Sequence, residues 1–600
     1  MNVPKRKWII KPKGDSKLIE NLAKELDIHP VLANLLVQRN IKSKEEAINF
    51  FRPSLDNLHD PFLMKDMEKA IDRLLKAIQN NEKILIYGDY DVDGTTAVAL
   101  LYSFLKKRYS NIDFYIPDRY EEGYGISIKG INFAAKNNFS LVIALDCGIK
   151  AIEKIKYANS KNVNFIICDH HLPGDELPEA IAVLDPKRSD CNYPFKELSG
   201  CGVGFKLLQA FCIKENIPFD ELFSFLDLVA VSIASDIVPI MGENRIIAYY
   251  GLKKLNENPI IGLKALKEIA KLNDTKININ DIVFKIGPRI NAAGRIERAN
   301  KAVKLLTSTN ETEAKRLAKE INDFNEDRKE LDQTIFKEAI ELIKKDPDYH
   351  KKKTTVLYKE DWNKGVIGIV ASRLIEYFYR PTIILTKSNG LINGSARTVE
   401  GFDLYKAIES CSHLLENYGG HTFAAGLTLR PENLYMFIQT FEKVVSETIN
   451  EEQLTPVIEI DDILEFKDID SKFFKILHMF EPYGPGNMTP IFISYDVYDS
   501  GSGRTIGKNN EHLRLELKQE TVKKYFFPAI AFNMGHKVQD LIQAKKFNVC
   551  YSIDKNEFMN KETLQLRIRD IQIPDLETAD DFDDIDNIDI EEETNIDENS

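Results

Sequence analysis

The sequence predicts an α/β protein with a parallel-sheet core, a long connector helix, a second α/β domain and a C-terminal β-barrel. Between residues 83 and 240, short apolar runs alternate with helix-like stretches, and several of the runs end at acidic or histidine residues. This alternation is typical of a parallel sheet whose carboxyl ends form one ligand-binding edge. Residues 455–573 instead hold several short strand-like runs, as expected for a small barrel.

Length and composition limit the class of protein. A chain of 600 residues is too long for one core and suggests about three to five domains. Its 43% apolar and 29% charged fractions are typical of soluble globular proteins, and no apolar run has the length of a membrane span. We therefore expect a cytoplasmic protein without membrane association. The seven cysteines include no C-x-x-C pair and indicate neither a disulfide framework nor a zinc ribbon.

The net charge of −13 comes from one segment. Residues 575–600 hold 13 Asp and Glu and no Lys or Arg, so residues 1–574 are neutral. A neutral body can still carry a basic groove, and nucleic acid is not excluded as a partner. We expect residues 574–600 to form a disordered acidic tail, which either solubilises the protein, mimics nucleic acid or binds a basic partner.

Residues 1–75 are predicted to be helical and accessory. Residues 30–37 form an apolar helical turn, and the segment at 43–46 has the Ser-x-x-Glu pattern of a capping box. Residues 64–78 repeat apolar side chains at helical spacing. No chemistry is visible before residue 83.

Three carboxylates follow the first predicted strand. Asp89, Asp91 and Asp93 come directly after the apolar run 83–86 and precede a helix-like stretch from residue 95. Side chains two apart on an extended segment point the same way, so their charges would be crowded together. Like charges this close repel unless a cation or a proton intervenes. The alternative is a solvated Asp/Gly turn at a strand end.

Further candidate ligands follow later runs. The run 141–145 ends in Asp146, the run 165–168 ends in Asp-His-His at 169–171, and the run 228–235 ends in Asp236. The set that can converge on one sheet edge is Asp91, Asp93, Asp146, Asp169, His170, His171 and Asp236. Each alone is usually a helix cap or an interior group, but together they favour a metal site. Carboxylates and imidazoles without thiolates suit Mn²⁺ or Mg²⁺.

These motifs resemble the four-motif signature of the DHH phosphoesterase superfamily. The resemblance implies hydrolysis of phosphodiester or phosphoanhydride bonds with two divalent metal ions. The metal ligands it implies are Asp91, Asp93, Asp146, His170 and Asp236. It also implies that Asp146 bridges the ions and that His171 contacts the scissile phosphate. Many members carry histidine where this chain has Tyr87, so Asp89 is a candidate substitute ligand.

Three other segments precede the second domain. The glycines of residues 198–206 lack a complete G-x-G-x-x-G and are interpreted as a tight turn into a helix. Residues 287–295 are expected to form a small-residue loop that carries Arg289. Residues 308–346 keep helical spacing amid many charges and predict a connector helix roughly 50 Å long.

Residues 350–447 are predicted to form the second α/β domain. Its segment 419–427 resembles the Gly-Gly-His signature of the DHH-associated C-terminal domain. That resemblance implies that Gly420 and His421 bind the nucleotide or phosphate of the substrate. Ser395 and Arg397 provide a hydroxyl and a guanidinium fork suited to a terminal phosphate. The residues alone indicate only an anion-binding loop.

The order of the parts resembles one branch of the superfamily, the RecJ exonucleases. Residues 481–487 resemble the turn before the barrel in that branch, and the resemblance spans about 25–570, with the DHH domain at 76–300. It implies a single-strand-specific 5′→3′ DNA exonuclease that releases 5′-mononucleotides in recombination and repair. The substrate-binding residues expected are Arg119, Tyr124, Arg289, Ser395, Arg397, Gly420 and His421.

The expected partners are single-stranded DNA, with a single-strand-binding protein and a helicase as further candidates, and the protein is expected to be a monomer. Two alternatives share the core. A small-substrate DHH phosphatase or cyclic-dinucleotide phosphodiesterase would not need the barrel. A non-catalytic DNA-binding replication scaffold would be expected to lose metal carboxylates, which are intact in this chain.

Overall fold

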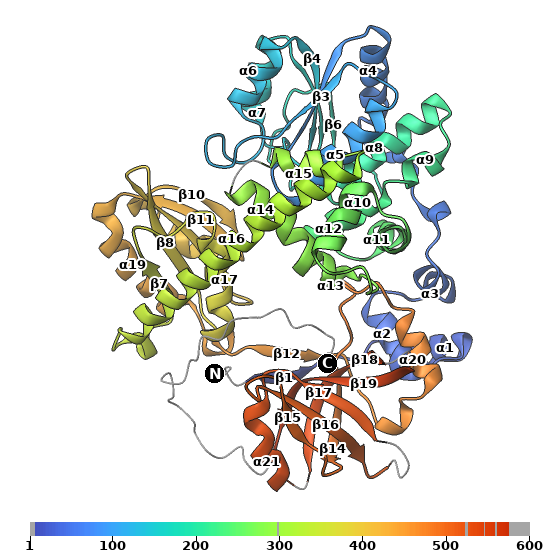
Figure 1. Cartoon of the computed structure of the whole chain (residues 1–600), viewed down its shortest axis with the longest axis vertical. Coiled ribbons are helices and arrows are strands. Elements are labelled where there is room, and N and C mark those ends of the chain that lie inside the picture. Colours follow the sequence, from blue (N-terminus) through green and yellow to red (C-terminus); the bar gives the residue numbers. More distant parts are fainter. Residues whose placement is uncertain (1–5, 297–298, 522–525, 545, 559–560, 575–600) are drawn as a thin grey trace. The chain divides into compact units, whose positions relative to one another are not determined.

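The chain folds into two compact units (Figure 1). The computed structural model describes residues 6–296, 299–521, 526–544, 546–558 and 561–574. The N-terminal unit comprises residues 14–326 together with 470–489, and the C-terminal unit comprises the remainder. The predicted acidic tail from residue 575 lies outside the described residues.

The N-terminal unit contains the predicted parallel sheet. Its five strands, in the order β3-β2-β4-β5-β6, are β2 (Lys83–Gly88), β3 (Ile112–Tyr115), β4 (Phe139–Leu145), β5 (Asn164–Cys168) and β6 (Ala182–Leu184). The strands are mainly apolar because helices cover both faces. Polar residues such as Lys83, Asp113 and Asn164 lie at or next to the strand starts. One face packs on α4 (Met67–Gln79), α5 (Val92–Lys106) and α8 (Gly200–Glu215), and the other on α6 (Ile128–Lys136) and α7 (Ile152–Ser160) (Figure 1).

The strand order places a topological switch point between β2 and β4. From β2 the chain passes to β3 on one side and then returns to β4 on the other side. In open parallel sheets, ligands bind outside the carboxyl ends of the strands at this point. The residues that follow β2 and β4 are those predicted to bind metal.

Two predictions about this unit were wrong. The run 228–235 belongs to helix α10 (Leu226–Ser235), so Asp236 follows a helix and not a strand. Residues 287–295 belong to helix α14 (Gly287–Ile296) and not to a loop. Nearly every residue of α10 is buried, between α5 and α11 (Gly242–Glu257). A short run that is apolar on all sides has no periodicity to distinguish a buried helix from a buried strand.

The remaining helices of the N-terminal unit include α12 (Ile261–Ile269) and α15 (Asn300–Leu306). The N-terminal region holds α1 (Ser16–Leu26), α2 (Pro30–Gln38) and α3 (Lys44–Phe51), and the predicted capping box at Ser43 and Glu46 is confirmed. The segment 470–489, with α20 (Ser471–His478), also belongs to this unit.

One buried arginine ties that returning segment to α11. Arg245 is only 3% exposed and donates to the main-chain carbonyls of Phe50, Met479, Phe480, Glu481 and Pro482. Its guanidinium lies 3.7 Å from the ring centroid of Phe50. The planar fork of an arginine is therefore satisfied by carbonyls spread over four consecutive residues and one distant one.

The predicted connector is confirmed as α16 (Glu311–Lys344). Leu317 and Ile321 pack into the core of the N-terminal unit. Phe336 and Ile340 pack into a separate core within the C-terminal unit. One continuous helix thus supplies core residues to both units (Figure 1).

The C-terminal unit begins with a five-stranded mixed sheet. Its order is β10-β11-β9-β8-β7, with β7 (Thr355–Tyr358), β8 (Thr382–Ser388), β9 (Leu391–Arg397), β10 (Leu415–His421) and β11 (Ala424–Leu429). Helices α17 (Ile367–Tyr377), α18 (Leu404–Glu409) and α19 (Leu434–Thr448) accompany the sheet. The expected anion loop at 419–427 is in fact the β10–β11 hairpin.

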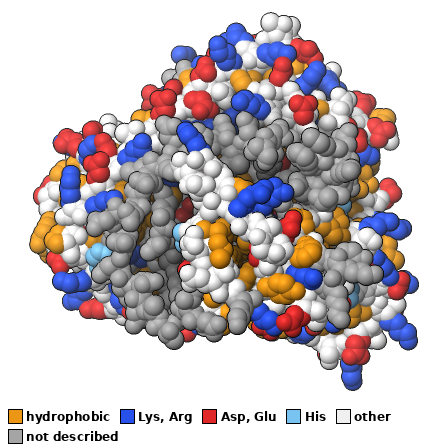
Figure 2. All heavy atoms as spheres, turned by 60° about the horizontal axis from the view of Figure 1, so that its bottom comes forward, with side chains coloured by type: hydrophobic (Ala, Val, Ile, Leu, Met, Phe, Trp, Pro, Cys, Tyr) orange, Lys and Arg blue, Asp and Glu red, His pale blue; other side chains and the backbone are white. Residues whose placement is uncertain are grey.

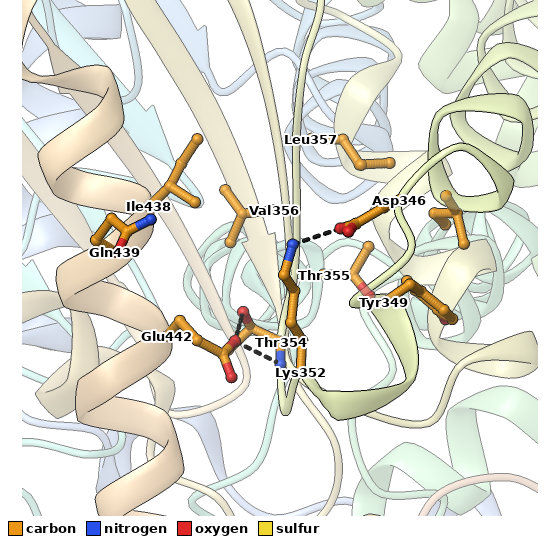
Figure 3. Close-up of a pocket in the computed structure, with 11 residues that line it drawn as sticks. Asp346, Tyr349, Lys352, Thr354, Thr355, Val356, Leu357, Ile438, Gln439 and Glu442 are labelled. Atoms are coloured by element: carbon orange, nitrogen blue, oxygen red, sulfur yellow. Dashed lines mark hydrogen bonds and ion pairs between the residues drawn. The ribbon is translucent and has the colours of Figure 1, made fainter.

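A pocket of about 240 Å³ lies between β7 and α19 (Figure 3). Its charged groups are matched within the pocket itself. Lys352 pairs with Asp346, and Glu442 accepts from the hydroxyl of Thr354. Because these polar groups satisfy one another, we interpret the pocket as a structural feature of the β7–α19 packing and not as a ligand site.

The predicted barrel is confirmed. Its strands are β14 (Phe492–Asp499), β16 (His512–Gln519), β17 (Phe527–Ala531), β18 (Phe547–Phe558) and β19 (Lys561–Gln572). They follow the order β14-β18-β19-β17-β16, and pairing of β14 with β16 closes the barrel. The run at 457–460 does not join it. As β12 it pairs in parallel with β1 (Lys7–Ile10), a strand in the region predicted to be helical.

No helix among the described residues is long and apolar enough to cross a membrane.

We predict that Arg245→Lys destabilises the N-terminal unit by about 2–4 kcal/mol, because a point-like ammonium cannot reach all five carbonyls. The urea midpoint of the purified protein should fall accordingly. Arg316→Lys, at an arginine whose side chain is 60% exposed, is the matched control and should leave the midpoint unchanged. Equal midpoints for both variants would contradict this role of Arg245.

Candidate metal centre and anion site

The structure brings the predicted ligands together at the switch point. Asp89, Asp91 and Asp93 follow β2, Asp146 follows β4, and His170 follows β5. Asp91 is also the N-cap of α5, since its Oδ1 accepts the N–H of Gly94 at 2.9 Å. The strand ends and this helix start therefore fix the backbone from which the carboxylates project.

Three groups of side chains are close enough to hold a cation. They are Asp93–His170–Asp236, Asp89–Asp91–Asp146 and Asp146–His170–His171, and within each the ligand atoms lie within 4.8 Å of one another. The Nε2 atom of His170 is 3.2 Å from Asp146 Oδ1, 3.5 Å from Asp236 Oδ2 and 3.8 Å from Asp93 Oδ2. Because the groups share Asp146 and His170, the arrangement suits two adjacent cations.

The donor atoms themselves fit a metal. Within the part of the chain that the structure describes, Asp89 Oδ1, Asp146 Oδ1 and both ring nitrogens of His170 are buried without a hydrogen-bond partner. Burying such atoms is costly unless something coordinates them. Carboxylate oxygens with one imidazole nitrogen form the ligand set that Mn²⁺ and Mg²⁺ accept.

The same crowding perturbs proton binding. Burial, and then the neighbouring carboxylates, raise the pKa values of Asp89, Asp91 and Asp146. Burial and the nearby Asp93 raise the pKa of Asp236 to about 8. Desolvation and like charge therefore both oppose full ionisation of the centre in the absence of a cation.

Asp93 has support that the sequence did not reveal. Its carboxylate accepts the backbone N–H groups of Gly200 and Cys201, at 2.6 and 2.7 Å, and the hydroxyl of Ser232 at 2.7 Å. The N-terminus of α8 thus holds this carboxylate. A Cβ on Gly200 would lie 2.5 Å from Asp146 Cβ, so glycine is needed there. The available signal was the Ser-Gly-Cys-Gly segment, which was interpreted only as a turn into a helix. In the structure Ser199 is the N-cap, and the glycines already belong to the first turn of α8.

Asp169 orients His171 and the neighbouring backbone, although the sequence pattern grouped it with the residues that converge as ligands. Its carboxylate accepts the N–H groups of Ile149, His170 and His171, and it lies 2.7 Å from Nδ1 of His171. Burial alone would lower the pKa of His171, but the hydrogen bond to Asp169 raises it to about 9. The Tyr124 hydroxyl is 3.2 Å from Nε2 of His171, so Tyr124 also lies at the centre.

Tyr87 points away from the centre. Its hydroxyl donates to the carbonyl of Gly125 and accepts the N–H of Ser127, within the core on the other face of the sheet. Asp89, two residues later, instead groups with Asp91 and Asp146. Asp89 is therefore placed to act as the substitute metal ligand, whereas Tyr87 is not.

The two arginines predicted in this unit differ in their surroundings. The guanidinium of Arg119 lies 4.8 Å from the ring centroid of Tyr90, and its charge partly offsets the raised pKa of Asp89. Arg289 donates to the side chain of Asn322 and to the carbonyl of Lys285. Arg119 is therefore near the carboxylates, whereas Arg289 supports the packing of α14 against α16.

The C-terminal unit carries a separate candidate anion site. Arg397 donates to Ser395 Oγ at 3.1 Å and to the carbonyl of Ala396 at 2.7 Å. A Cβ on Gly368, in the first turn of α17, would lie 2.8 Å from Ser395 Oγ and 3.2 Å from Arg397 Nη2. A helix N-terminus, a hydroxyl and a guanidinium thus converge, which is an arrangement suited to phosphate. Gly368 was missed because a glycine inside an apolar helix gives no sequence signal of what it faces.

The β10–β11 hairpin keeps the surface beside this site clear. In register, Ser395 pairs with Gly426, which pairs with Gly419, and Arg397 pairs with Ala424, which pairs with His421. Residues in such a row share one face of the sheet. Gly420 has φ +153°, and a Cβ there would lie 2.3 Å from the carbonyl oxygen of Ala424. His421 therefore shares a face of the sheet with Arg397, and only the small side chain of Ala424 stands between them.

Three family models match the chain: the N-terminal domain of the DHH family at residues 83–233, the DHHA1 domain at 351–447 and the RecJ OB domain at 460–570. The single-stranded-DNA-specific exonuclease RecJ of Bacillus subtilis is 36% identical over 97% of this chain and 72% of its own length. The chain belongs to the RecJ family. RecJ of Haemophilus influenzae is 33% identical over 90% of this chain and 96% of its own length.

Solved RecJ structures are also similar. RecJ of Thermus thermophilus in complex with Mn²⁺ matches with a TM-score of 0.81 and 25% identity, over 95% of this chain and 80% of that one. A manganese-bound exonuclease RecJ matches with a TM-score of 0.58 and 30% identity, over 66% of this chain and 97% of that one. Both the sheet core and the barrel of this chain therefore have counterparts in the RecJ family.

We predict that the metal-free protein loses stability as pH rises. Carboxyl groups whose pKa values are raised by folding bind protons more tightly in the folded state and stabilise it when protonated. This contribution to stability is lost as pH rises from about 4 to the pKa of Asp236, about 8. In EDTA, the melting temperature should be lower at pH 8.5 than at pH 6, and Mn²⁺ should raise it most at the higher pH.

Asp146→Asn separates this effect from general pH sensitivity. Asp146 has φ +57°, a conformation that asparagine tolerates. The variant should be more stable than the parent in EDTA at pH 8.5, by about 1–3 kcal/mol, and should gain little from Mn²⁺. Asp113→Asn, at an exposed position on β3, is the control. An unchanged response to Mn²⁺ in Asp146→Asn would refute the proposed centre.

Proposed function

We propose that this protein is a metal-dependent exonuclease specific for single-stranded DNA, which degrades the strand 5′→3′ and releases 5′-mononucleotides. The observation that carries the proposal is the carboxylate–histidine centre. The same chain also carries a candidate phosphate site at Ser395 and Arg397. Its curated relatives are named single-stranded-DNA-specific exonucleases and match it over nearly its whole length. The barrel disfavours the small-substrate alternatives, and the intact ligands disfavour a non-catalytic scaffold.

Mn²⁺ or Mg²⁺ is the proposed cofactor, because related RecJ structures from Thermus thermophilus contain one or the other. The residues that would hold two ions are Asp89, Asp91, Asp93, Asp146, His170 and Asp236. When bound, such ions lower the pKa of water and neutralise the charge that develops on a phosphate during hydrolysis. Asp146, which belongs to two of the three ligand groups, would be shared between the ions.

The other residues of the centre would orient the substrate. His171, held by Asp169 and favoured in its protonated form, would donate to the scissile phosphate. The hydroxyl of Tyr124, which lies 3.2 Å from Nε2 of His171, would give up that place to an oxygen of the bound phosphate. The N-terminus of α8 and Ser232 would keep the Asp93 carboxylate in place as charge changes during the reaction.

Direction would follow from recognition of the 5′ end. Ser395, Arg397 and the first turn of α17 would bind a terminal phosphate. Arg119 of the N-terminal unit is proposed separately as a substrate-binding cation. Gly420, His421 and Arg289 are proposed to contact the strand. The barrel would bind single-stranded DNA further along. We also propose a monomeric, cytoplasmic protein that acts with a single-strand-binding protein and a helicase in recombination and repair.

The direct test supplies Mn²⁺ with a 5′-labelled single strand, a 3′-labelled single strand and a duplex. We expect mononucleotides to appear at once from the 5′ label, later from the 3′ label and hardly at all from the duplex. Asp146→Asn should lower the rate by more than the roughly 100-fold that the loss of a supporting group costs. Immediate release from the 3′ label, or equal digestion of duplex, would overturn the assignment.

Recognition of the terminal phosphate is tested at Gly368. The added methyl group of Gly368→Ala would crowd Ser395 and Arg397. We expect the preference for a 5′-phosphate over a 5′-hydroxyl to fall about tenfold, which is the loss of roughly one charge-assisted hydrogen bond. Arg397→Gln should have the same effect. Ser372→Ala, at an exposed position on the same helix, should leave the preference intact. A lowered rate with an unchanged preference would exclude this site as the reader of the 5′ end.

A further inference from the structure

We propose that the acidic segment 575–600 of this chain docks on a row of arginines on the outer face of its own barrel, where it competes with single-stranded DNA. The competition with DNA rests on the proposed function. The docking itself rests on the barrel and on the distribution of charge in the chain.

The arginine row crosses neighbouring strands of the barrel sheet. Arg504 on β15 (Arg504–Ile506) pairs in register with Arg514 on β16. Arg514 pairs with Ile530 on β17, and Ile530 pairs with Arg567 on β19. Partners in register share one face of a sheet, so the three arginines and Ile530 form one line across the strands. Arg504 and Arg514 are exposed, and Arg567 is half-buried.

This row is not neutralised by the described part of the barrel. Among the residues that the structure describes, none forms an ion pair with Arg504, Arg514 or Arg567. Glu516 lies on the same outer face of β16. Its carboxylate accepts from the hydroxyl of Ser500 at 3.2 Å and keeps its charge, but it forms no ion pair with these arginines among the described residues. Like charges directly opposite each other on adjacent strands are destabilising. The row therefore favours binding of an anion that spans several strands.

Neighbouring side chains give the row an apolar component. The guanidinium of Arg567 lies 5.1 Å from the ring centroid of Phe532, and Ile530 stands between two of the arginines. On the face shown in Figure 2, the coloured Lys and Arg side chains are interspersed with Asp and Glu side chains. A line of arginines without acidic partners is thus unlike that surface.

The chain carries a matching polyanion. Residues 575–600 contain 13 Asp and Glu and no Lys or Arg, with Phe582, Ile585 and Ile588 placed among them. This segment starts three residues after Gln572, the end of β19, which is the strand that carries Arg567. A fully extended chain of that length spans at most about 90 Å, enough to cross the barrel face. Tethering would give an effective concentration in the millimolar range, so weak ion pairs suffice.

The functional consequence is selection among ligands. An incoming nucleic acid must displace the tethered tail, so only a strand that binds the arginine row tightly enough will occupy it. Because both interactions are electrostatic and exposed, each should weaken with added salt. The tail would therefore suppress weak, non-specific binding of DNA while leaving the metal centre unaltered.

The test of docking uses a labelled synthetic peptide of residues 575–600 and the full-length chain. In one variant, the 13 tail carboxylates become amides (Asp→Asn, Glu→Gln). At low salt we expect fluorescence anisotropy to show the peptide binding this variant about tenfold more tightly than the parent, whose own tail occupies the row. Arg514→Gln with Arg567→Gln, added to the amide variant, should weaken peptide binding about tenfold.

Two further variants control for charge and folding. Arg514→Lys with Arg567→Lys should retain most of the peptide binding, because it keeps the charge. Lys443→Gln with Lys467→Gln removes two exposed charges outside the barrel strands and should change nothing. Equal peptide binding by the parent and the amide variant, or binding indifferent to Arg514→Gln with Arg567→Gln, would overturn the proposal.

The DNA arm is measured separately, in EDTA, with a labelled single strand. We expect the amide variant to bind the strand about tenfold more tightly than the parent at low salt, and the peptide to displace the strand. If the strand is neither bound nor digested, the proposed exonuclease function fails, while the peptide titrations still decide whether the tail docks. Tighter DNA binding without any effect of the peptide would overturn the competition.

Discussion

The repulsion between buried carboxylates at the ends of β2 and β4 is the constraint on which the N-terminal unit depends. Asp89, Asp91 and Asp146 are brought together by a parallel sheet whose strand order reverses at this place. Asp89 and Asp146 are buried and Asp91 is half-buried, so hydration stabilises their charges poorly. The surrounding fold offsets part of this cost with fixed dipoles and hydroxyl donors, and the remaining imbalance creates the affinity for cations.

The helices around the sheet can be understood from the same constraint. Helix α8 directs its N-terminus at Asp93, and α10 contributes both Ser232, which donates to Asp93, and Asp236, which follows its last turn. An apolar helix buried on all sides is well suited to this task, since it brings a buried hydroxyl and a partly exposed carboxylate to the centre. The helices therefore complete an electrostatic arrangement that the strands alone would leave unstable.

The sequence allowed much of this to be predicted, because alternation of apolar runs with acidic ends determines where parallel strands deliver their ligands. It did not show that Asp236 follows a helix, since the preceding run is apolar on every side. It did not distinguish Asp169, which binds backbone N–H groups, from ligands with the same side chain. It also gave no indication of Gly368, whose role depends on a contact with β9 that only the fold creates. Local pattern thus located the site, and tertiary contacts assigned the roles.

Two clusters of like charge in the described part of the chain have opposite sign and different surroundings. The carboxylates of the metal centre are buried, where low dielectric makes their demand for a cation strong and poorly screened by salt. The arginines of the barrel row are largely exposed, so their demand for an anion is weaker and sensitive to ionic strength. Because they are buried, the carboxylates of the metal centre can hold their ions through many turnovers. Because they are exposed, the arginines of the barrel row can exchange one polyanion for another. A strand that must move through an exonuclease requires that exchange.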